Sequence, residues 1–286
     1  MQPDLKDILL VLDSYPRPTN KNVIESSMAL AKKLHAHVTG LSFEVGVEIK
    51  TSYLAHALGI DSGVLEMLAV EKQKSLSNAK DLLRTFEIAA KKAGLHFHSI
   101  LQEAKQEEIS RVAIQHARLR DFTIVSTNDP ELGDTGAEDL LFESGRPILI
   151  PPRDLKRGNA PSLDSIAVAW DSSRVATRAI SDALPLLRLA KHVRVFTVLN
   201  EKRLPSAPLN AELQAHLGRY GIEAAMENID ARGKAIAEIL RDYIEVKDVG
   251  LLVMGGYGHS RLKEFVLGGA TKAVLTQPFQ WTFLSH

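Results

Sequence analysis

The sequence predicts an α/β protein made of two tandem domains, each built on a five-stranded parallel sheet with helices on both faces. Short apolar runs alternate with amphipathic stretches of helical period along the chain, which is typical of parallel sheets. The pattern of the first half restarts in the second half, where SIAVAWD at 165–171 matches DILLVLD at 7–13. A polar, proline-rich stretch lies between the halves, and this composition indicates a linker. We therefore expect a domain at residues 1–152, a linker at 153–163 and a second domain at 164–286.

The first half contains the elements of one such domain. Its expected strands are residues 7–13, 38–43, 96–101, 122–126 and 147–150, and its expected helices are 20–34, 65–93 and 105–116. Asn20 suits the N-cap of the first helix, and Gly94 suits the C-cap of the second. Residues 128–145 are polar and irregular, so the sequence leaves open whether a last helix precedes the fifth strand.

The second half repeats this order of elements. Its expected strands are residues 165–171, 193–199, 222–228, 250–254 and 281–284, and its expected helices are 174–191, 209–220, 233–245 and a last one that starts at Ala270. The first of these helices follows two serines that suit its N-cap, and Gly221 ends the second. Both halves therefore have the alternation of strand and helix that builds a doubly wound sheet.

The two halves are an internal duplication, which we call the first repeat (1–152) and the second repeat (164–286). Asp13 aligns with Asp171 and Gly94 with Gly221, and we align Ile124-Val125 with Leu252-Val253. The offset between the repeats falls from 158 at the aspartates to 127 at the glycines. The first repeat should therefore carry about thirty extra residues between its second and third strands, around 44–75.

A glycine-rich loop follows the strand at 250–254. Its spacing is Gly255, two residues, Gly258, nine residues, Gly268, and a helix is expected to begin two residues later. Glycines let a phosphate approach the main chain without a Cβ in the way, and a helix N-terminus favours an anion. Asp171 also follows the carboxyl end of a strand, so we expect it to face the same crevice as this loop.

The loop matches neither of the two common nucleotide motifs. It has no Gly-Lys-Ser/Thr sequence, so the lysine and the Mg²⁺-binding hydroxyl of a P-loop are missing. Arg261 stands where the third glycine of a dinucleotide-binding fingerprint would fall, and the loop follows a late strand instead of the first. Any nucleotide would have to be held by backbone groups in another arrangement.

Each of these residues also has a purely structural interpretation. The glycines would serve tight turns and helix caps, and Asp171 would serve a turn or an N-cap. We interpret Asp13 as structural. Arg261, like the neighbouring lysine, suits a solvated face, and His259 suits an ordinary loop position, although both lie where a phosphate could be reached.

The sequence predicts no metal site and no catalytic residue. His96 and His98 share one face of a strand, a spacing that can bind metal, but no third ligand is evident. Serine, histidine and acidic residues are present, but no pattern brings them together as a catalytic group.

The tandem strands that end in aspartate, together with the G-x2-G-x9-G spacing, resemble the two-domain form of the universal stress protein family over essentially the whole chain. The resemblance implies a Rossmann-like fold of the adenine nucleotide alpha hydrolase type. Many members of this family bind ATP or AMP, with or without Mg²⁺, while others bind no nucleotide. It also implies a regulatory role in stress response.

The resemblance assigns a set of residues to the nucleotide. Asp171 and Val198 would lie near the adenosine, and the ribose and phosphates would lie along Gly255, Gly258, Gly268, Gly269 and Ala270, with His259 and Arg261 within reach. Nucleotide-binding members usually have Ser or Thr directly after the last glycine of the motif, but this chain has Gly269 there. Thr271 is the hydroxyl that would take over this role.

The first repeat departs further from the family pattern. Its fourth strand is followed by Ser126-Thr127-Asn128-Asp129-Pro130 in place of Gly-x-x-Gly. Acidic residues at 129, 131 and 134 would repel a phosphate. We therefore expect that the first repeat does not bind ATP in the family manner.

The composition excludes several other classes of protein. Lysine plus arginine equals aspartate plus glutamate, 35 of each, which argues against a nucleic-acid binder that relies on a broad basic surface. The chain has no cysteine, so it can form neither a disulfide framework nor a thiolate metal site. Its apolar runs are too short to cross a bilayer. We expect a soluble cytoplasmic protein.

Three functions remain open from the sequence. The first is a regulatory protein that binds ATP or AMP in its second repeat. The second is an enzyme that slowly hydrolyses ATP or transfers an adenylyl group, and the third is an interaction module with unknown protein partners and no nucleotide. In the family, the last strands of two domains pair across a dimer. We therefore expect 147–150 and 281–284 to pair within one chain as a pseudo-dimer, and a homodimer remains open.

Overall fold

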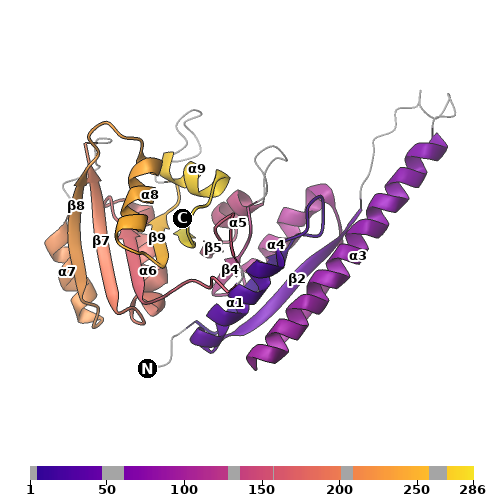
Figure 1. Ribbon diagram of the computed structural model, residues 1–286, viewed down its shortest axis with the longest axis horizontal. Helices are drawn as coiled ribbons and strands as arrows, with labels where there is room; N and C mark the ends of the chain where they lie inside the picture. The colour runs from indigo at the N-terminus through magenta and orange to yellow at the C-terminus, as the bar shows by residue number, and fades with distance from the viewer. Residues whose placement is uncertain (1–4, 47–60, 128–135, 157, 201–208, 258–268) are drawn as a thin grey trace.

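The computed structural model describes residues 5–46, 61–127, 136–156, 158–200, 209–257 and 269–286. The two repeats lie side by side and share one sheet (Figure 1). The strands of the first repeat are β1 (Asp7–Leu12), β2 (His37–Gly46), β3 (Phe97–Lys105), β4 (Phe122–Ile124) and β5 (Ile148–Ile150). Those of the second repeat are β6 (Ser165–Ala169), β7 (His192–Leu199), β8 (Ala224–Asp230), β9 (Leu251–Gly255) and β10 (Thr282–Ser285).

The described helices alternate with these strands as expected. In the first repeat they are α1 (Lys21–Leu34), α3 (Asp61–Ala93), the 3-10 helix η1 (Gln106–Glu108), α4 (Ile109–Ala117) and α5 (Ala137–Glu143). In the second repeat they are α6 (Arg174–Leu187), α7 (Asn210–Arg219), α8 (Ile236–Val246) and α9 (Gly269–Thr276). None of the helices in the described part of the chain is both long and apolar enough to cross a membrane.

The ten strands form one sheet in the order β3-β2-β1-β4-β5-β10-β9-β6-β7-β8. Within each repeat the paired strands are parallel, whereas β5 and β10 pair antiparallel in the centre. This central pair is the junction between the repeats, with Leu149 opposite Phe283. The last strands of the two repeats thus pair within one chain, as the sequence predicted.

Helices cover both faces of the sheet. The core on one face is built with α1, α3, α6 and α7, and the core on the other with α4, α5, α8 and α9. Side chains of β1 alternate between them, because successive residues of a strand point to opposite faces: Leu10 and Leu12 enter the first core and Leu9 and Val11 the second. The predicted fold class is confirmed.

Glycines end the corresponding helices α3 and α7 of the two repeats in the same way. Gly94 follows α3 with φ 71°, and Gly221 follows α7 with φ 74°. In both cases the next amide closes the helix end, from Leu95 to Ala90 O at 3.0 Å and from Ile222 to Leu217 O at 3.1 Å. This left-handed turn favours glycine. It also delays the next strand, so that β8 begins at Ala224 instead of the expected residue 222.

The strand registers correct our internal alignment by one residue. Leu10 pairs with Ile124 in the first repeat, and Val168 pairs with Val253 in the second. Leu10 and Val168 correspond, since they share the offset of the two strand-end aspartates. Ile124 therefore corresponds to Val253 and not to Leu252, and the offset there is 129 (253 minus 124). A slip of one residue matters because it exchanges the two faces of a strand.

The corrected alignment changes which residues replace the glycines in the first repeat. Ser126 stands at the position of Gly255, and Thr127 stands at the position of Gly256. Two residues with side chains thus occupy the places where the second repeat has none.

The extra residues of the first repeat build mainly a longer helix. α3 has 33 residues and begins at Asp61 instead of the expected residue 65, whereas its counterpart α7 has 10. α3 lies along β2 as a long diagonal helix (Figure 1). Part of the expected insert, 47–60, lies outside the described residues.

One other expectation about the first repeat was wrong, and one question that the sequence left open is answered. β3 runs to Lys105, which pairs with Gly46 of the long β2. The helix expected at 105–116 therefore begins with η1 and continues as α4, because pairing with a neighbouring strand outweighs local helix propensity. The polar stretch near residue 140 contains α5, which buries Ala137, Leu140 and Leu141.

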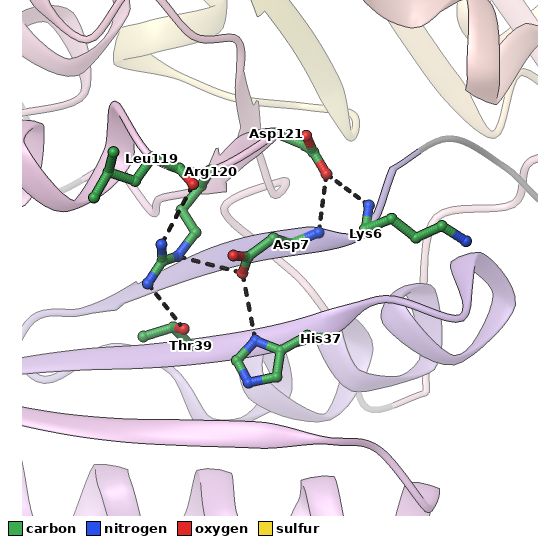
Figure 2. A network of polar contacts seen from close by, with 7 residues as sticks. All are labelled: Lys6, Asp7, His37, Thr39, Leu119, Arg120 and Asp121. Atoms are coloured by element: carbon green, nitrogen blue, oxygen red, sulfur yellow. Dashed lines mark hydrogen bonds and ion pairs between the residues drawn. The ribbon is translucent and has the colours of Figure 1, made fainter.

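A polar network ties the amino-terminal ends of the first repeat's strands together (Figure 2). The Asp121 carboxylate accepts the amides of Lys6 at 2.6 Å and Asp7 at 2.9 Å. Asp7 Oδ1 in turn lies 3.3 Å from Arg120 Nε and 3.4 Å from His37 Nδ1. The network lies at the edge opposite the strand carboxyl ends, and we interpret it as structural.

Candidate functional site

The candidate site lies where the strand order reverses in the second repeat. β6 lies between β7 and β9; the connection to β7 passes through α6 on one face, and the connection into β9 passes through α8 on the other. Crevices at such switch points, beyond the carboxyl ends of the strands, hold the ligands of open α/β sheets. The last pair of this ladder is Ala169 with Met254. Asp171 and Gly256 each follow this pair by two residues, just beyond the ends of the adjacent strands β6 and β9. The expected aspartate and the start of the loop therefore lie at the same edge of the sheet.

Asp171 forms a turn at this edge. Its Oδ1 accepts the amide of Ser173 at 3.0 Å, and the Ser173 hydroxyl caps α6 by accepting the amide of Ala176 at 3.2 Å. Between them, Ser172 has a left-handed backbone with φ 59°. Its Oγ is buried and has no hydrogen-bond partner. The sequence suggested Ser172 only as a helix start, and the structure places its hydroxyl below the surface beside Asp171.

Val198 lies near the end of β7 and is partly buried. It packs against the core on the α8–α9 face, as do Ala169 and Ala270. The structure therefore places the expected adenosine residue and the start of α9 on the same face of the sheet.

Two glycines of the loop are required by packing. A Cβ on Gly255 would lie 2.6 Å from Ala176 N and 2.6 Å from Val175 C, both backbone atoms of α6. A Cβ on Gly256 would lie 2.6 Å from Leu141 Cδ2, a side-chain atom of α5 in the first repeat. Since real Cβ contacts are longer, these glycines have a structural reason that needs no ligand.

The start of α9 is open, but its hydroxyl is engaged. Gly269 is exposed and Ala270 is partly exposed, so the first amides of α9 are within reach of an anion. The Thr271 side chain is only 3 % exposed, and its Oγ1 accepts the amide of Tyr257 at 3.1 Å. Thr271 therefore supports the loop, and this contact argues against the phosphate-facing role expected for it.

The remaining loop residues of the prediction lie outside the described residues. These are Gly258, His259, Arg261 and Gly268. Tyr257, the third residue of the loop, is 8 % exposed and stacks on Phe142 of the first repeat. No local pattern signals this partner, because the two residues are 115 positions apart in the chain.

At the corresponding edge of the first repeat, an aspartate and two hydroxyls are buried. Burial raises the pKa of Asp13 from 3.8 to about 7. Its Oδ2 is buried without a hydrogen-bond partner, as are the hydroxyls of Ser126 and Thr127 in the adjacent chain segment. Asp13 therefore favours the neutral form in the fold.

No described residues form a metal centre: within the part of the chain that the structure covers, no group of three or more His, Asp or Glu side chains could hold an ion.

The strand order and the helices on both faces of the sheet define a doubly wound α/β protein. A universal stress protein from Archaeoglobus fulgidus DSM 4304 has the same fold at 17% identity, with 97% of this chain and 95% of that chain covered and a TM-score of 0.67. A putative universal stress protein from Pseudomonas aeruginosa UCBPP-PA14 matches at 15% identity, with 99% and 94% covered and a TM-score of 0.54. A functionally unknown protein from Pseudomonas aeruginosa PAO1 matches at 15% identity, with 99% and 93% covered and a TM-score of 0.55.

These structures establish the fold, which is that of universal stress proteins in the tandem form. No family model matches the sequence, and no curated protein matches it. The resemblance drawn from the aspartate-ended strands and the glycine spacing is confirmed at the level of the fold.

Proposed function

We propose that this chain is a universal stress protein of regulatory function in stress response, and that it binds ATP or AMP in its second repeat. The observation that carries the proposal is the exposed start of α9, on the same face of the sheet as Val198. An exposed helix start offers unpaired amides and partial positive charge to a phosphate. A partly buried valine on the same face offers an apolar surface to a base.

In this proposal, different described residues contact the phosphates, the adenine and the ribose. The amides at Gly269 and Ala270 would take phosphate oxygens, and Val198 would contact the adenine. Asp171 would accept a hydrogen bond from a ribose hydroxyl, since a carboxylate offers acceptor oxygens.

An acidic residue at the start of α9 tests the proposal. Ala270→Asp should weaken ATP binding by at least about tenfold, because a carboxylate at this position repels the phosphates. The melting temperature should change little, since the favourable place of an acidic residue in the first turn of a helix offsets the partial burial of Ala270. Titration calorimetry and thermal unfolding measure the two effects.

Ala270→Ser is the matched control, because serine keeps the small size and adds no charge. It should bind ATP as well as wild type does. If wild type binds neither ATP nor AMP at millimolar nucleotide, or if Ala270→Asp binds as wild type does, the proposed site is wrong.

The structure also favours a second candidate, an interaction module that binds no nucleotide. Gly255 and Gly256 have packing reasons, and the Thr271 hydroxyl is engaged by Tyr257. An absence of binding in the calorimetry would support this candidate. Steady ATP hydrolysis that Ala270→Asp abolishes would instead favour an enzyme, the third function left open by the sequence.

A further inference from the structure

We infer that the first repeat positions the start of the second repeat's loop, through the Phe142 ring that clamps Tyr257. Phe142 lies on α5, and Tyr257 is the third residue of the loop that starts at Gly255. The inference rests on the proposed function for the loop's role as a ligand site, while the clamp itself rests on contacts between described residues.

Three rings meet where the repeats join. The Phe142 and Tyr257 rings stack with centroids 5.1 Å apart and planes at 22°. The His286 ring packs edge-on against the same Phe142 ring, with centroids 4.6 Å apart and planes at 70°. The His286 Nδ1 lies 2.9 Å from the carbonyl oxygen of Gly256. Stacked and edge-to-face pairs are the favourable aromatic geometries, so Phe142 holds both chain segments of the second repeat.

The backbone of the loop is fixed at the same place. The Gly256 amide donates to Ser285 O at 2.8 Å, and the Tyr257 amide donates to Thr271 Oγ1 at 3.1 Å. Leu141, the neighbour of Phe142 on α5, occupies the space that a Cβ on Gly256 would need. The start of the loop is therefore held between α5 of the first repeat and β10 and α9 of the second.

Tyr257 needs such a clamp because its backbone is strained. Its φ is 50°, in the left-handed region that a bulky residue enters at a cost. A side chain that is buried to 8 % exposure and stacked on a neighbouring ring keeps the residue there. Without the Phe142 ring, we expect the turn at Tyr257 to open and its amide to leave the Thr271 hydroxyl.

The second repeat has no aromatic residue at the position that corresponds to Phe142. Ile124 pairs with Leu149 and its counterpart Val253 pairs with Phe283, so Leu149 corresponds to Phe283 at an offset of 134 (283 minus 149). Phe142 then corresponds to Thr276, which has no ring and whose hydroxyl donates to Lys272 O within α9. The first repeat has lost the glycines of its own loop, but it supplies the aromatic residue that supports the loop of the second.

Hydrogen exchange and nucleotide affinity test the inference together. Phe142→Ala in the full chain should speed exchange of the Gly256 and Tyr257 amides at least about tenfold. The Leu252 amide, which donates to Trp281 O in the same sheet region, should keep its protection. The variant should also bind ATP at least about tenfold more weakly, because the loop is no longer held in place.

Two further variants separate a positioning role from general damage. Phe142→Tyr keeps the ring and should restore both exchange protection and affinity. Phe97→Leu removes an equally packed aromatic residue, edge-on to Phe86 at 5.8 Å, and should change neither. Phe142→Leu replaces the alanine variant if that one does not fold.

The outcomes distinguish the inference from the proposed function. Unchanged exchange at Tyr257, or unchanged affinity in a protein whose wild type binds ATP, overturns the inference. Faster exchange in Phe142→Ala with no nucleotide bound by wild type supports the clamp and overturns the proposed function alone.

Discussion

Replacing Asp13 with asparagine should stabilise the protein at pH 8 by about 2–4 kcal/mol. Burial raises the pKa of Asp13 from 3.8 to about 7, so the ionised carboxylate is disfavoured in the fold. Each unit by which the pKa differs between the folded and the unfolded chain corresponds to about 1.4 kcal/mol of stability. Asparagine has nearly the same shape and no charge to bury, and it therefore removes this cost.

Because the pKa of Asp13 is higher in the folded chain than in the unfolded chain, the stability of the protein depends on pH. Below pH 3.8 the folded and unfolded chains are both protonated at Asp13, so the carboxyl contributes no pH dependence. Between about 4 and 7 the unfolded chain has released its proton while the folded chain retains it. Stability therefore falls as the pH rises through this window, and the full cost remains above pH 7. Urea unfolding of wild type and Asp13→Asn from pH 4 to pH 8 measures the difference.

Asp171→Asn is the matched control, since Asp171 holds the equivalent position in the second repeat. Its carboxylate accepts the Ser173 amide at the start of α6, so we expect no stabilisation at pH 8. A stability difference between wild type and Asp13→Asn that is constant from pH 4 to pH 8 would contradict the raised pKa of Asp13.

The second large effect concerns a glycine of the loop. Gly255→Ala should lower the free energy of unfolding by about 3 kcal/mol, because its Cβ would collide with the backbone of α6. Backbone atoms of a packed helix cannot move aside as a flexible side chain can. The loss should be the same with and without nucleotide, and urea unfolding measures it.

Two other glycines provide the comparison. Gly256→Ala meets only the end of the Leu141 side chain, so it should cost about 1 kcal/mol. Gly218→Ala lies inside α7 with no atom near its added Cβ, so it should be neutral or stabilise by up to about 1 kcal/mol. If Gly255→Ala is as stable as wild type but loses nucleotide binding, the glycine serves the ligand and our packing argument is wrong.

The sequence identified the regular elements well where the signal is local. Apolar runs, helical periodicity and glycine stops depend on neighbours within a few residues. Gly94 and Gly221 therefore ended their helices as predicted. The errors arose where a residue distant in the sequence determines the end of an element. β3 continues to Lys105 because β2 pairs with it as far as Gly46. The internal alignment was wrong by one residue because only strand pairing reveals the register.

The sequence by itself determined that this chain is a duplicated α/β protein with a glycine loop in its second repeat alone, because periodicity, spacing and repetition are properties of the linear order. Only the tertiary structure decided what surrounds that loop. It assigned Gly255 to the packing of α6, engaged the Thr271 hydroxyl with the Tyr257 amide, and placed Phe142 of the other repeat against Tyr257. These contacts join residues far apart in the chain, and they exist because β5 and β10 pair antiparallel and bring the two repeats together.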